Sequence, residues 1–204
     1  MIRSFIRSID TRNPNPIEKN LIRMRNDLKT HRYPFLFTLY EAVLILRPMK
    51  IVEWGTKTGA TAITMGMAAK KLGNCWIYSY DRFEKEVFNS VSLNYPMEKT
   101  AANLLKYNMN DIVSLKEMDF WEWIKDPTWF ELLYLDINND GGKIKALYDA
   151  VKGMNRATIL FEGGSVERDK VPWMKDRLPI NSIKEYVNYS VIDERWPSLS
   201  MIKL

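Results

Sequence analysis

The chain has 204 residues, of which 46% are hydrophobic and 27% charged, and it carries a net charge of +5 at pH 7. These values are typical of a single globular domain with a substantial core. No uninterrupted apolar run approaches the roughly 20 residues of a membrane span, and early arginines interrupt any secretory signal, so we expect a cytoplasmic protein without membrane contact. The mild positive charge leaves open an anionic substrate or nucleic acid as partner.

The scarcity of two residue types restricts the chemistry. Cys75 is the only cysteine and His31 the only histidine. An intrachain disulfide, a cysteine-based zinc site and a histidine-rich metal site are therefore excluded. His31 falls between two predicted helices, where we interpret it as an exposed turn residue rather than a catalytic base.

Residues 1–33 are predicted to form an N-terminal helical arm, and residues 34–204 the main domain. Apolar residues recur at helical spacing at the start of the arm, at Ile2, Phe5, Ile6 and Ile9. Pro14 interrupts this segment, and a second helix is expected from Pro16 to residue 29. We expect the amphipathic start to dock on the domain or on a second subunit, which would make the protein a homo-oligomer.

The main domain alternates helices and strands. Helices are expected over 34–46, 60–71, 84–94, 97–108, 120–125 and 143–152, and strands over 51–54, 75–80, 112–115, 130–135 and 157–161. This alternation indicates a mainly parallel sheet with helices on both faces. Residues 189–194 and 199–204 are two further strands with no room for a helix between them, so they are predicted to form an antiparallel hairpin at the sheet edge.

The segment that joins the first strand to the next helix is the most informative. It reads Glu53-Trp54-Gly55-Thr56-Lys57-Thr58-Gly59 and leads into a helix from Ala60. Glycines let a ligand approach the backbone closely, and the amides of a helix N-terminus attract an anion. Because Glu53 adds a carboxylate beside these donors, the bend suits a ligand with both an ammonium and a carboxylate group. S-adenosylmethionine is such a cofactor.

Acidic residues also end each of the later parallel strands. They are Asp81, Asp119, Asp136 and Glu162. Each of them taken singly has a simpler interpretation, because aspartate and glutamate often cap helices. Together with Glu53 they favour a site, since the carboxyl ends of parallel strands meet at one edge of a sheet and ligands of open α/β sheets bind there.

This pattern resembles the class I S-adenosylmethionine-dependent methyltransferases over residues 34–204. Glu53, Gly55 and Gly59 match their Glu-x-Gly-x-x-x-Gly motif, and the branch that resembles macrolide sugar O-methyltransferases often has a basic residue where Lys57 stands and a hydroxyl residue where Thr61 stands. The resemblance implies a Rossmann-like, doubly wound sheet of seven strands in a three-layer α/β/α arrangement. The sheet would be mostly parallel, with a C-terminal antiparallel hairpin.

The resemblance also implies which residues hold the cofactor. Those at its methionine end would be Glu53, Gly55, Thr56, Gly59 and Thr61. Asp81 would bind the two ribose hydroxyls, and Asp119 the adenine amino group. Phe120 or Trp121 would contact the adenine ring.

Asp136 and Glu162 would lie nearest the transferable methyl group. Metal-dependent members of the family bind a divalent cation such as Mg²⁺ with carboxylates at these two strand ends, and the cation activates the acceptor hydroxyl. Asp136, Asn138 and Glu162 fit that pattern, whereas Gly163 stands where the family has a further ligand. The alternative is that Glu162 itself acts as the general base.

We therefore expect an enzyme that methylates a small hydroxylated molecule. An RNA or protein methyltransferase and a non-catalytic binding module with the same fold remain open. A nicotinamide-dependent oxidoreductase is a further alternative, because an acid after the second strand also suits its cofactor. The bend disfavours it, since such enzymes carry Gly-x-Gly-x-x-Gly rather than Gly-x-x-x-Gly.

Overall fold

The computed structural model describes residues 15–29, 33–88, 91–137, 141–162, 187–194, 196 and 199–204. Outside these ranges lie residues 1–14, His31, Asn138 and Gly163. The roles that the sequence suggests for them therefore stay predictions. The helices are α1 (Pro16–Leu28), α2 (Tyr33–Leu46), α3 (Ala60–Leu72), α4 (Met97–Lys106), α5 (Phe120–Trp123) and α6 (Gly141–Val151). The strands are β1 (Lys50–Trp54), β2 (Trp76–Asp81), β3 (Lys85–Phe88), β4 (Val91–Asn94), β5 (Val113–Glu117), β6 (Leu132–Leu135), β7 (Thr158–Glu162), β8 (Ser190–Val191) and β9 (Leu199–Lys203).

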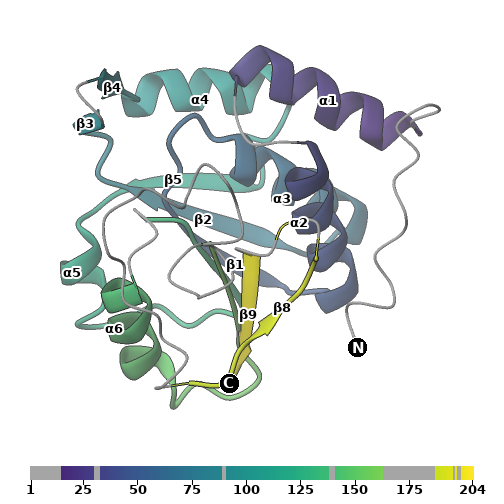
Figure 1. Ribbon diagram of the computed structural model, residues 1–204. Helices are drawn as coiled ribbons and strands as arrows, with labels where there is room; N and C mark the ends of the chain where they lie inside the picture. The colour runs from purple at the N-terminus through teal and green to yellow at the C-terminus, as the bar shows by residue number, and fades with distance from the viewer. Residues whose placement is uncertain are drawn as a thin grey trace.

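Seven strands form one sheet in the order β5-β2-β1-β6-β7-β9-β8 (Figure 1). The five strands from β5 to β7 are parallel, and β9 runs antiparallel to both β7 and β8. The strand order reverses at β1, from which the chain proceeds first to β2 and later to β6. This confirms the predicted doubly wound sheet and its C-terminal antiparallel hairpin.

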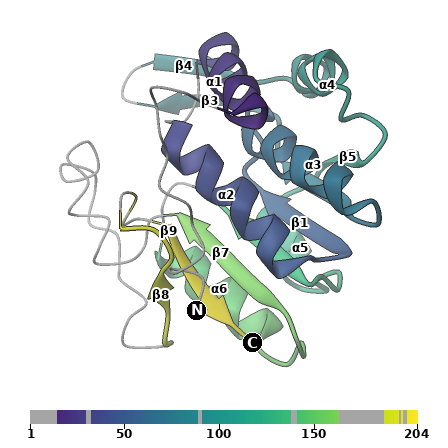
Figure 2. The ribbon, with the colours of Figure 1, turned by 90° about the vertical axis from the view of Figure 1, so that its right-hand side faces the viewer.

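Helices cover both faces of the sheet (Figure 2). Ile51 of β1 points into a core that it shares with α1, α2, α3 and α4, whereas its neighbour Val52 points into a second core with α5 and α6. Side chains of a strand alternate between faces, so a central parallel strand is apolar on both sides. The predicted three-layer arrangement is therefore confirmed. None of the helices in the described ranges is long and apolar enough to cross a membrane.

Helix α1 begins with a complete capping box. The Asn15 side chain accepts a hydrogen bond from the Glu18 amide at 3.0 Å, and the Glu18 carboxylate accepts one from the Asn15 amide at 2.6 Å. Such reciprocal caps satisfy amides that the helix itself leaves unpaired. Leu21 and Met24 of α1 are fully buried in the same core as α2 and α3. This part of the expected arm thus packs into the core of the main domain.

The prediction of a helix over residues 84–94 is wrong. This segment forms the antiparallel strands β3 and β4, which pair separately from the main sheet, and Phe88 is the register partner of Val91. Valine, phenylalanine and other β-branched or aromatic residues favour strands, and only two residues separate the paired ends, as in a tight hairpin. The short apolar stretches had no periodicity long enough to distinguish the two structures.

Candidate functional site

The bend between β1 and α3 is formed by residues with left-handed backbone. The φ angles are +97° at Gly55, +47° at Lys57 and +82° at Gly59, which is the N-cap of α3. A Cβ on Gly55 would lie 2.2 Å from the carbonyl oxygen of Asp136. The Asp136 amide in turn donates to the Trp54 carbonyl at 2.9 Å. Glycine is therefore required at position 55 because the end of β6 passes against it. This requirement holds whether or not a ligand approaches the bend.

A cavity with about 600 Å³ of space, part of it open to solvent, lies beside this bend. The acids that line it are Asp81, Asp119 and Asp136, from the ends of β2, β5 and β6. The aromatic residues are Trp54, Phe120 and Trp121, and the cations Lys57, Arg82 and Lys143. Three of the five strand-end acids thus meet in one cavity, as the parallel topology predicts.

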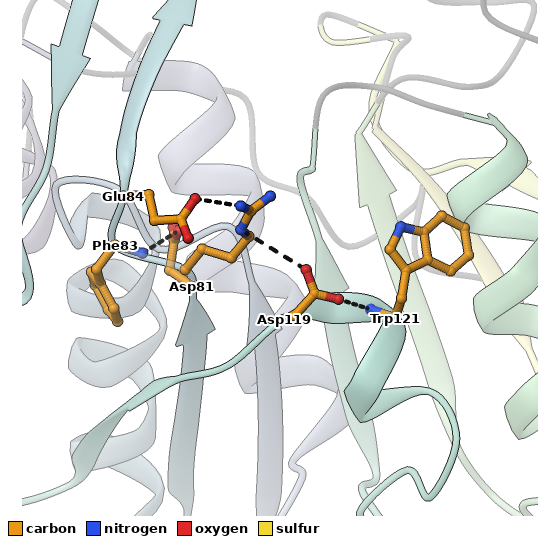
Figure 3. Close-up of polar contacts among 6 residues, drawn as sticks. Asp81, Phe83, Glu84, Asp119 and Trp121 are labelled. Atoms are coloured by element: carbon orange, nitrogen blue, oxygen red, sulfur yellow. Dashed lines mark hydrogen bonds and ion pairs between the residues drawn. The ribbon is translucent and has the colours of Figure 1, made fainter.

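Asp81 is half-buried and supports the bend directly. One of its carboxylate oxygens accepts a hydrogen bond from the Lys57 amide at 2.9 Å. The other accepts one from the Phe83 amide at 3.2 Å, as Figure 3 shows. A carboxylate oxygen has two lone pairs, so each still has capacity for a further donor. The residue can therefore hold the bend and bind two hydroxyl groups at the same time.

Asp119 is both a helix cap and a cavity residue. Its side chain accepts a hydrogen bond from the Trp121 amide at 2.8 Å and lies 3.9 Å from Nε of Arg82, which also pairs with Glu84 (Figure 3). The capping interpretation of this acid is thus confirmed. One carboxylate oxygen carries the cap, and the other faces the arginine, which places a charged pair at the cavity wall.

The two aromatic residues after Asp119 differ in accessibility. Phe120 is only 4% exposed and packs edge-on against Trp54, with ring centroids 5.4 Å apart. Trp121 is 48% exposed, and its indole meets Phe120 at 5.3 Å. The open aromatic surface of this cavity therefore belongs to Trp121, and Phe120 lies behind it.

Asp136 and Glu162 end adjacent strands but differ in what they face. Asp136 is 6% exposed and lines the cavity, whereas Glu162 is 3% exposed and lines neither of the two cavities described here. Tyr134, which is fully buried on β6, has a pKa well above its ordinary value because of burial and the nearby carboxylates of Asp136, Glu162 and Glu53. Its phenol therefore stays protonated and acts only as a hydrogen-bond donor or acceptor.

The predicted magnesium site lacks a complete set of ligands in the described part of the chain. No three histidine, cysteine, aspartate or glutamate side chains come together there to hold a metal ion. Of the residues predicted to hold Mg²⁺, Asp136 lines the cavity, Glu162 lines neither cavity, and Asn138 lies outside the described ranges. The described residues therefore do not support a bound Mg²⁺ ion.

Glu53 occupies a different position from the one expected. Its carboxyl group is fully buried, lines neither cavity and accepts hydrogen bonds from the hydroxyls of Thr61 and Ser79. Strand alternation explains this, because Trp54 points to the α5 and α6 face and Glu53 to the α3 face. The expectation that Glu53 presents a carboxylate to a ligand does not agree with this arrangement.

Burial raises the pKa of Glu53 to about 7, although the hydrogen bonds from Ser79 and Thr61 act in the opposite direction. The unfolded chain releases this proton near its ordinary pKa of 4.5, while the folded protein keeps it. Glu53 therefore contributes stability that is fully present below pH 4.5 and is lost as the pH rises towards 7. The contribution is about 3 kcal/mol over that window.

In a Glu53→Gln variant we expect the unfolding free energy to lack this pH-dependent contribution, because glutamine does not titrate. Denaturant unfolding of both proteins at pH 5 and pH 8 measures it: the wild-type protein should lose more unfolding free energy between the two pH values than the variant. If the unfolding free energies of the two proteins change equally between these pH values, the raised pKa of Glu53 is contradicted.

A second cavity, with about 360 Å³ of space, adjoins the first and shares Gly55 and Lys57 with it. Hydroxyl groups, two lysines and the start of α3 line it: Thr56, Thr58, Thr61, Tyr95, Lys29, Lys57 and Ala60. No acidic side chain is among its lining residues in the part of the chain that the structure describes. The two cavities thus differ in chemistry, because the first has both acidic and basic side chains and the second has basic side chains and hydroxyls.

Sequence reasoning did not single out Lys143 and Lys29, which line these cavities, or Ser79, which lines neither but contacts Glu53. Lys143 lies in the first turn of α6 and Lys29 directly after α1, and both are ordinary surface lysines by sequence. Ser79 is fully buried in the middle of β2, where its contact with Glu53 depends on strand pairing. No local pattern marks any of the three, so only the register of β1 and β2 could have indicated Ser79.

No protein-family model and no curated protein sequence matches the chain. Solved structures do match. The O-methyltransferase TomG from Streptomyces achromogenes, involved in tomaymycin synthesis and solved with S-adenosylmethionine, aligns with a TM-score of 0.60 and 12% identity over 94% of this chain and 90% of its own. The Podospora anserina methyltransferase PaMTH1, with S-adenosylhomocysteine bound, aligns with a TM-score of 0.59 and 15% identity over 93% and 87%.

An O-methyltransferase from Bacillus cereus in complex with S-adenosylhomocysteine aligns with a TM-score of 0.58 and 11% identity, covering 98% of this chain and 94% of its own. Identities at this level bear on the fold alone. Together with the strand order, the reversal at β1 and the antiparallel β9, they show that the chain has the Rossmann-like fold of the class I S-adenosylmethionine-dependent methyltransferases.

Proposed function

We propose that this chain is an S-adenosylmethionine-dependent methyltransferase that methylates a hydroxyl group of a small molecule. The observation that carries the proposal is the pair of adjoining cavities on either side of Gly55 and Lys57. One offers carboxylates and an open indole, which suit a nucleoside. The other offers lysines, hydroxyls and helix amides, which suit the carboxylate of an amino acid.

The first cavity would bind the nucleoside. Asp81 has lone pairs left for the two ribose hydroxyls, and charge-assisted hydrogen bonds of this kind are the strong ones. Asp119 would accept from the adenine amino group, and Trp121 would stack on the ring. Phe120, which the sequence also suggested as a contact of the adenine ring, would instead pack behind Trp121.

The second cavity would bind the methionine end. The backbone of Gly55, Thr56 and Gly59 would approach it closely, and the first amides of α3 at Ala60 and Thr61 would face its carboxylate. When bound, S-adenosylmethionine supplies an electrophilic methyl group. The protein contributes by aligning an acceptor oxygen behind that methyl, and such positioning lowers the barrier substantially.

Asp136 would orient the acceptor, because its carboxylate lines the first cavity near the bend. An oxygen nucleophile must lose its proton, and a carboxylate at hydrogen-bond distance can accept it. Lys143 lies half-buried in the same cavity wall, where its ammonium would stabilise the negative charge that develops on the oxygen. Glu162 lines neither cavity, so it would serve as a second carboxylate only for an acceptor that reaches the end of β7.

Replacing Trp121 by alanine is expected to weaken S-adenosylhomocysteine binding roughly tenfold, because stacking of a base on an aromatic side chain contributes on the order of 1–3 kcal/mol. Calorimetric titration measures the affinity. Trp76→Ala is the matched control, since Trp76 is similarly exposed but starts β2, at the opposite end of the strand from the site. Equal affinities of the two variants would contradict the assignment of Trp121.

Two measurements test the proposed activity. Thermal shift in the presence of S-adenosylhomocysteine or NAD separates a methyltransferase from a nicotinamide-dependent oxidoreductase, and we expect stabilisation by S-adenosylhomocysteine alone. Transfer from a methyl-labelled donor to pools of small metabolites, RNA or protein then identifies the class of acceptor. Label in small hydroxylated molecules is expected. Binding without any transfer would instead support a non-catalytic module.

The arrangement of the whole chain remains part of this proposal. Residues 34–204 would form the methyltransferase domain, and residues 1–33 an arm whose first part contacts a second copy. Size-exclusion chromatography with light scattering, on the full chain and on a variant lacking residues 1–14, measures this directly. A smaller particle for the shortened chain is the expected result.

A further inference from the structure

We propose that Glu53 is a positioning residue that sets the glycine bend through Ser79, Thr56 and Thr61, and that it makes no contact with the cofactor. This assignment rests on the proposed function, because it concerns how the bend comes to fit the bound ligand. It differs from the prediction made from the motif, in which the same carboxylate binds the cofactor directly.

The carboxyl group of Glu53 ties together three segments that frame the bend. One oxygen accepts a hydrogen bond from the hydroxyl of Thr61 in the first turn of α3, and the other accepts one from Ser79 on β2. The Ser79 hydroxyl lies 2.6 Å from that of Thr56, which belongs to the bend itself. Loss of the carboxyl would therefore release the bend and the start of α3 from β1 and β2.

The direction of this hydroxyl chain follows from counting protons. Ser79 has one hydroxyl proton and gives it to Glu53, so Thr56 must donate to Ser79 when Glu53 is ionised. If Glu53 carries the proton, the chain can reverse, with Thr56 donating to the Tyr80 carbonyl 3.1 Å away. That carbonyl also accepts from the Gly55 amide at 3.0 Å, so neither state leaves it unpaired. The network is satisfied in both protonation states without a ligand.

The surroundings of Glu53 leave no open side for a ligand. Its side chain is 0% exposed. Its hydroxyl partners Ser79 and Thr61 are 0% and 4% exposed, and Thr56, which bonds Ser79, is 2% exposed. Both carboxyl oxygens already have donors within the protein. A ligand ammonium would have to displace one of these buried hydroxyls and leave it unpaired, which is costly.

Two ligands distinguish positioning from contact. S-adenosylhomocysteine carries the amino-acid portion, and 5′-methylthioadenosine is the corresponding nucleoside thioether without it. If Glu53 positions the bend, Glu53→Met, Ser79→Ala and Thr61→Val should each weaken both ligands by a similar factor, roughly tenfold, as expected for a lost buried hydrogen bond. Methionine has a similar size to glutamate but cannot accept these hydrogen bonds. Calorimetric titration of each variant with each ligand gives the factors.

Thr64→Val provides a matched control for Thr61→Val. Thr64 lies three residues further along the same helix, is also buried, and donates only to the Ala60 carbonyl of its own helix. Its replacement should leave both affinities unchanged. Weaker binding of S-adenosylhomocysteine alone by Glu53→Met would overturn the proposal in favour of direct contact. Unchanged affinity of Glu53→Met for both ligands would overturn it as well, because Glu53 would then have no role at the site.

Hydrogen exchange of the ligand-free protein provides a readout that does not depend on the function. We expect faster exchange at the amides of Gly59 and Ile63, which bond within the bend and the first turn of α3, in Glu53→Met and Ser79→Ala but not in Thr64→Val. Unchanged exchange would overturn the positioning role. If the wild-type chain binds neither ligand, the proposed function fails, and the exchange data still decide whether Glu53 holds the bend.

Discussion

An Asp81→Ala variant is expected to lose S-adenosylhomocysteine binding by roughly a hundredfold or more while it keeps its fold. The two ribose hydroxyls would lose a charged acceptor, and each hydrogen bond to a charged group contributes about 1.5–3 kcal/mol. The same change removes the acceptor for the Lys57 and Phe83 amides, which loosens the bend. Calorimetric titration measures the affinity, and circular dichroism confirms the fold.

The control for this experiment is Asp111→Ala. Asp111 is an exposed aspartate that pairs with Lys70 at 2.9 Å outside the cavity, so its removal changes the net charge equally. Its affinity for S-adenosylhomocysteine should match that of the wild-type protein. If Asp81→Ala also binds as tightly as the wild-type protein, the nucleoside is not held at the end of β2 and the proposed cofactor site is wrong.

A Gly55→Ala variant is expected to lose about 3–5 kcal/mol of unfolding free energy. The new methyl group would overlap the Asp136 carbonyl oxygen at 2.2 Å, and backbone on both sides prevents either group from moving aside easily. The φ angle of +97° adds strain for any residue with a Cβ. For a chain of this size the corresponding fall in melting temperature is about 10 °C.

Gly73→Ala separates the two causes. Gly73 also has a left-handed backbone, with φ of +83°, but a Cβ there would meet nothing within 4 Å. This variant should therefore lose only the conformational contribution, about 1–2 kcal/mol. Equal melting temperatures for the two alanine variants would show that the close approach of β1 and β6 is not what requires glycine at position 55.

The alternation of helices and strands could be predicted because the strands are short apolar runs bounded by turn residues and most helices are amphipathic. The structure of the connection between β2 and α4 could not be predicted in this way. Residues 85–88 pair with residues 91–94, and a ten-residue stretch with apolar residues near its centre is compatible with either a helix or a hairpin. Only the antiparallel register of Phe88 with Val91 decides between them.

The convergence of Asp81, Asp119 and Asp136 followed from sequence, because it depends only on the strands being parallel and ending at one edge. The same reasoning could not say which side chain at such an edge faces the cavity. Phe120 and Trp121 are neighbours in sequence, yet one packs on Trp54 and the other is exposed, because the one-turn helix α5 points them in different directions.

The sequence by itself thus determined the alternation of main-sheet strands and helices, the glycine bend and the edge at which the acids gather, since these depend on local patterns and on the rules of parallel sheets. Tertiary structure alone decided the orientation of Glu53. Its hydroxyl partners Thr61 and Ser79 lie 8 and 26 residues away, and they meet the carboxyl only because β2 pairs with β1 in one register and α3 packs over both. A buried acid without those donors would be too costly to desolvate, so long-range pairing determines whether this carboxyl faces the protein or a ligand.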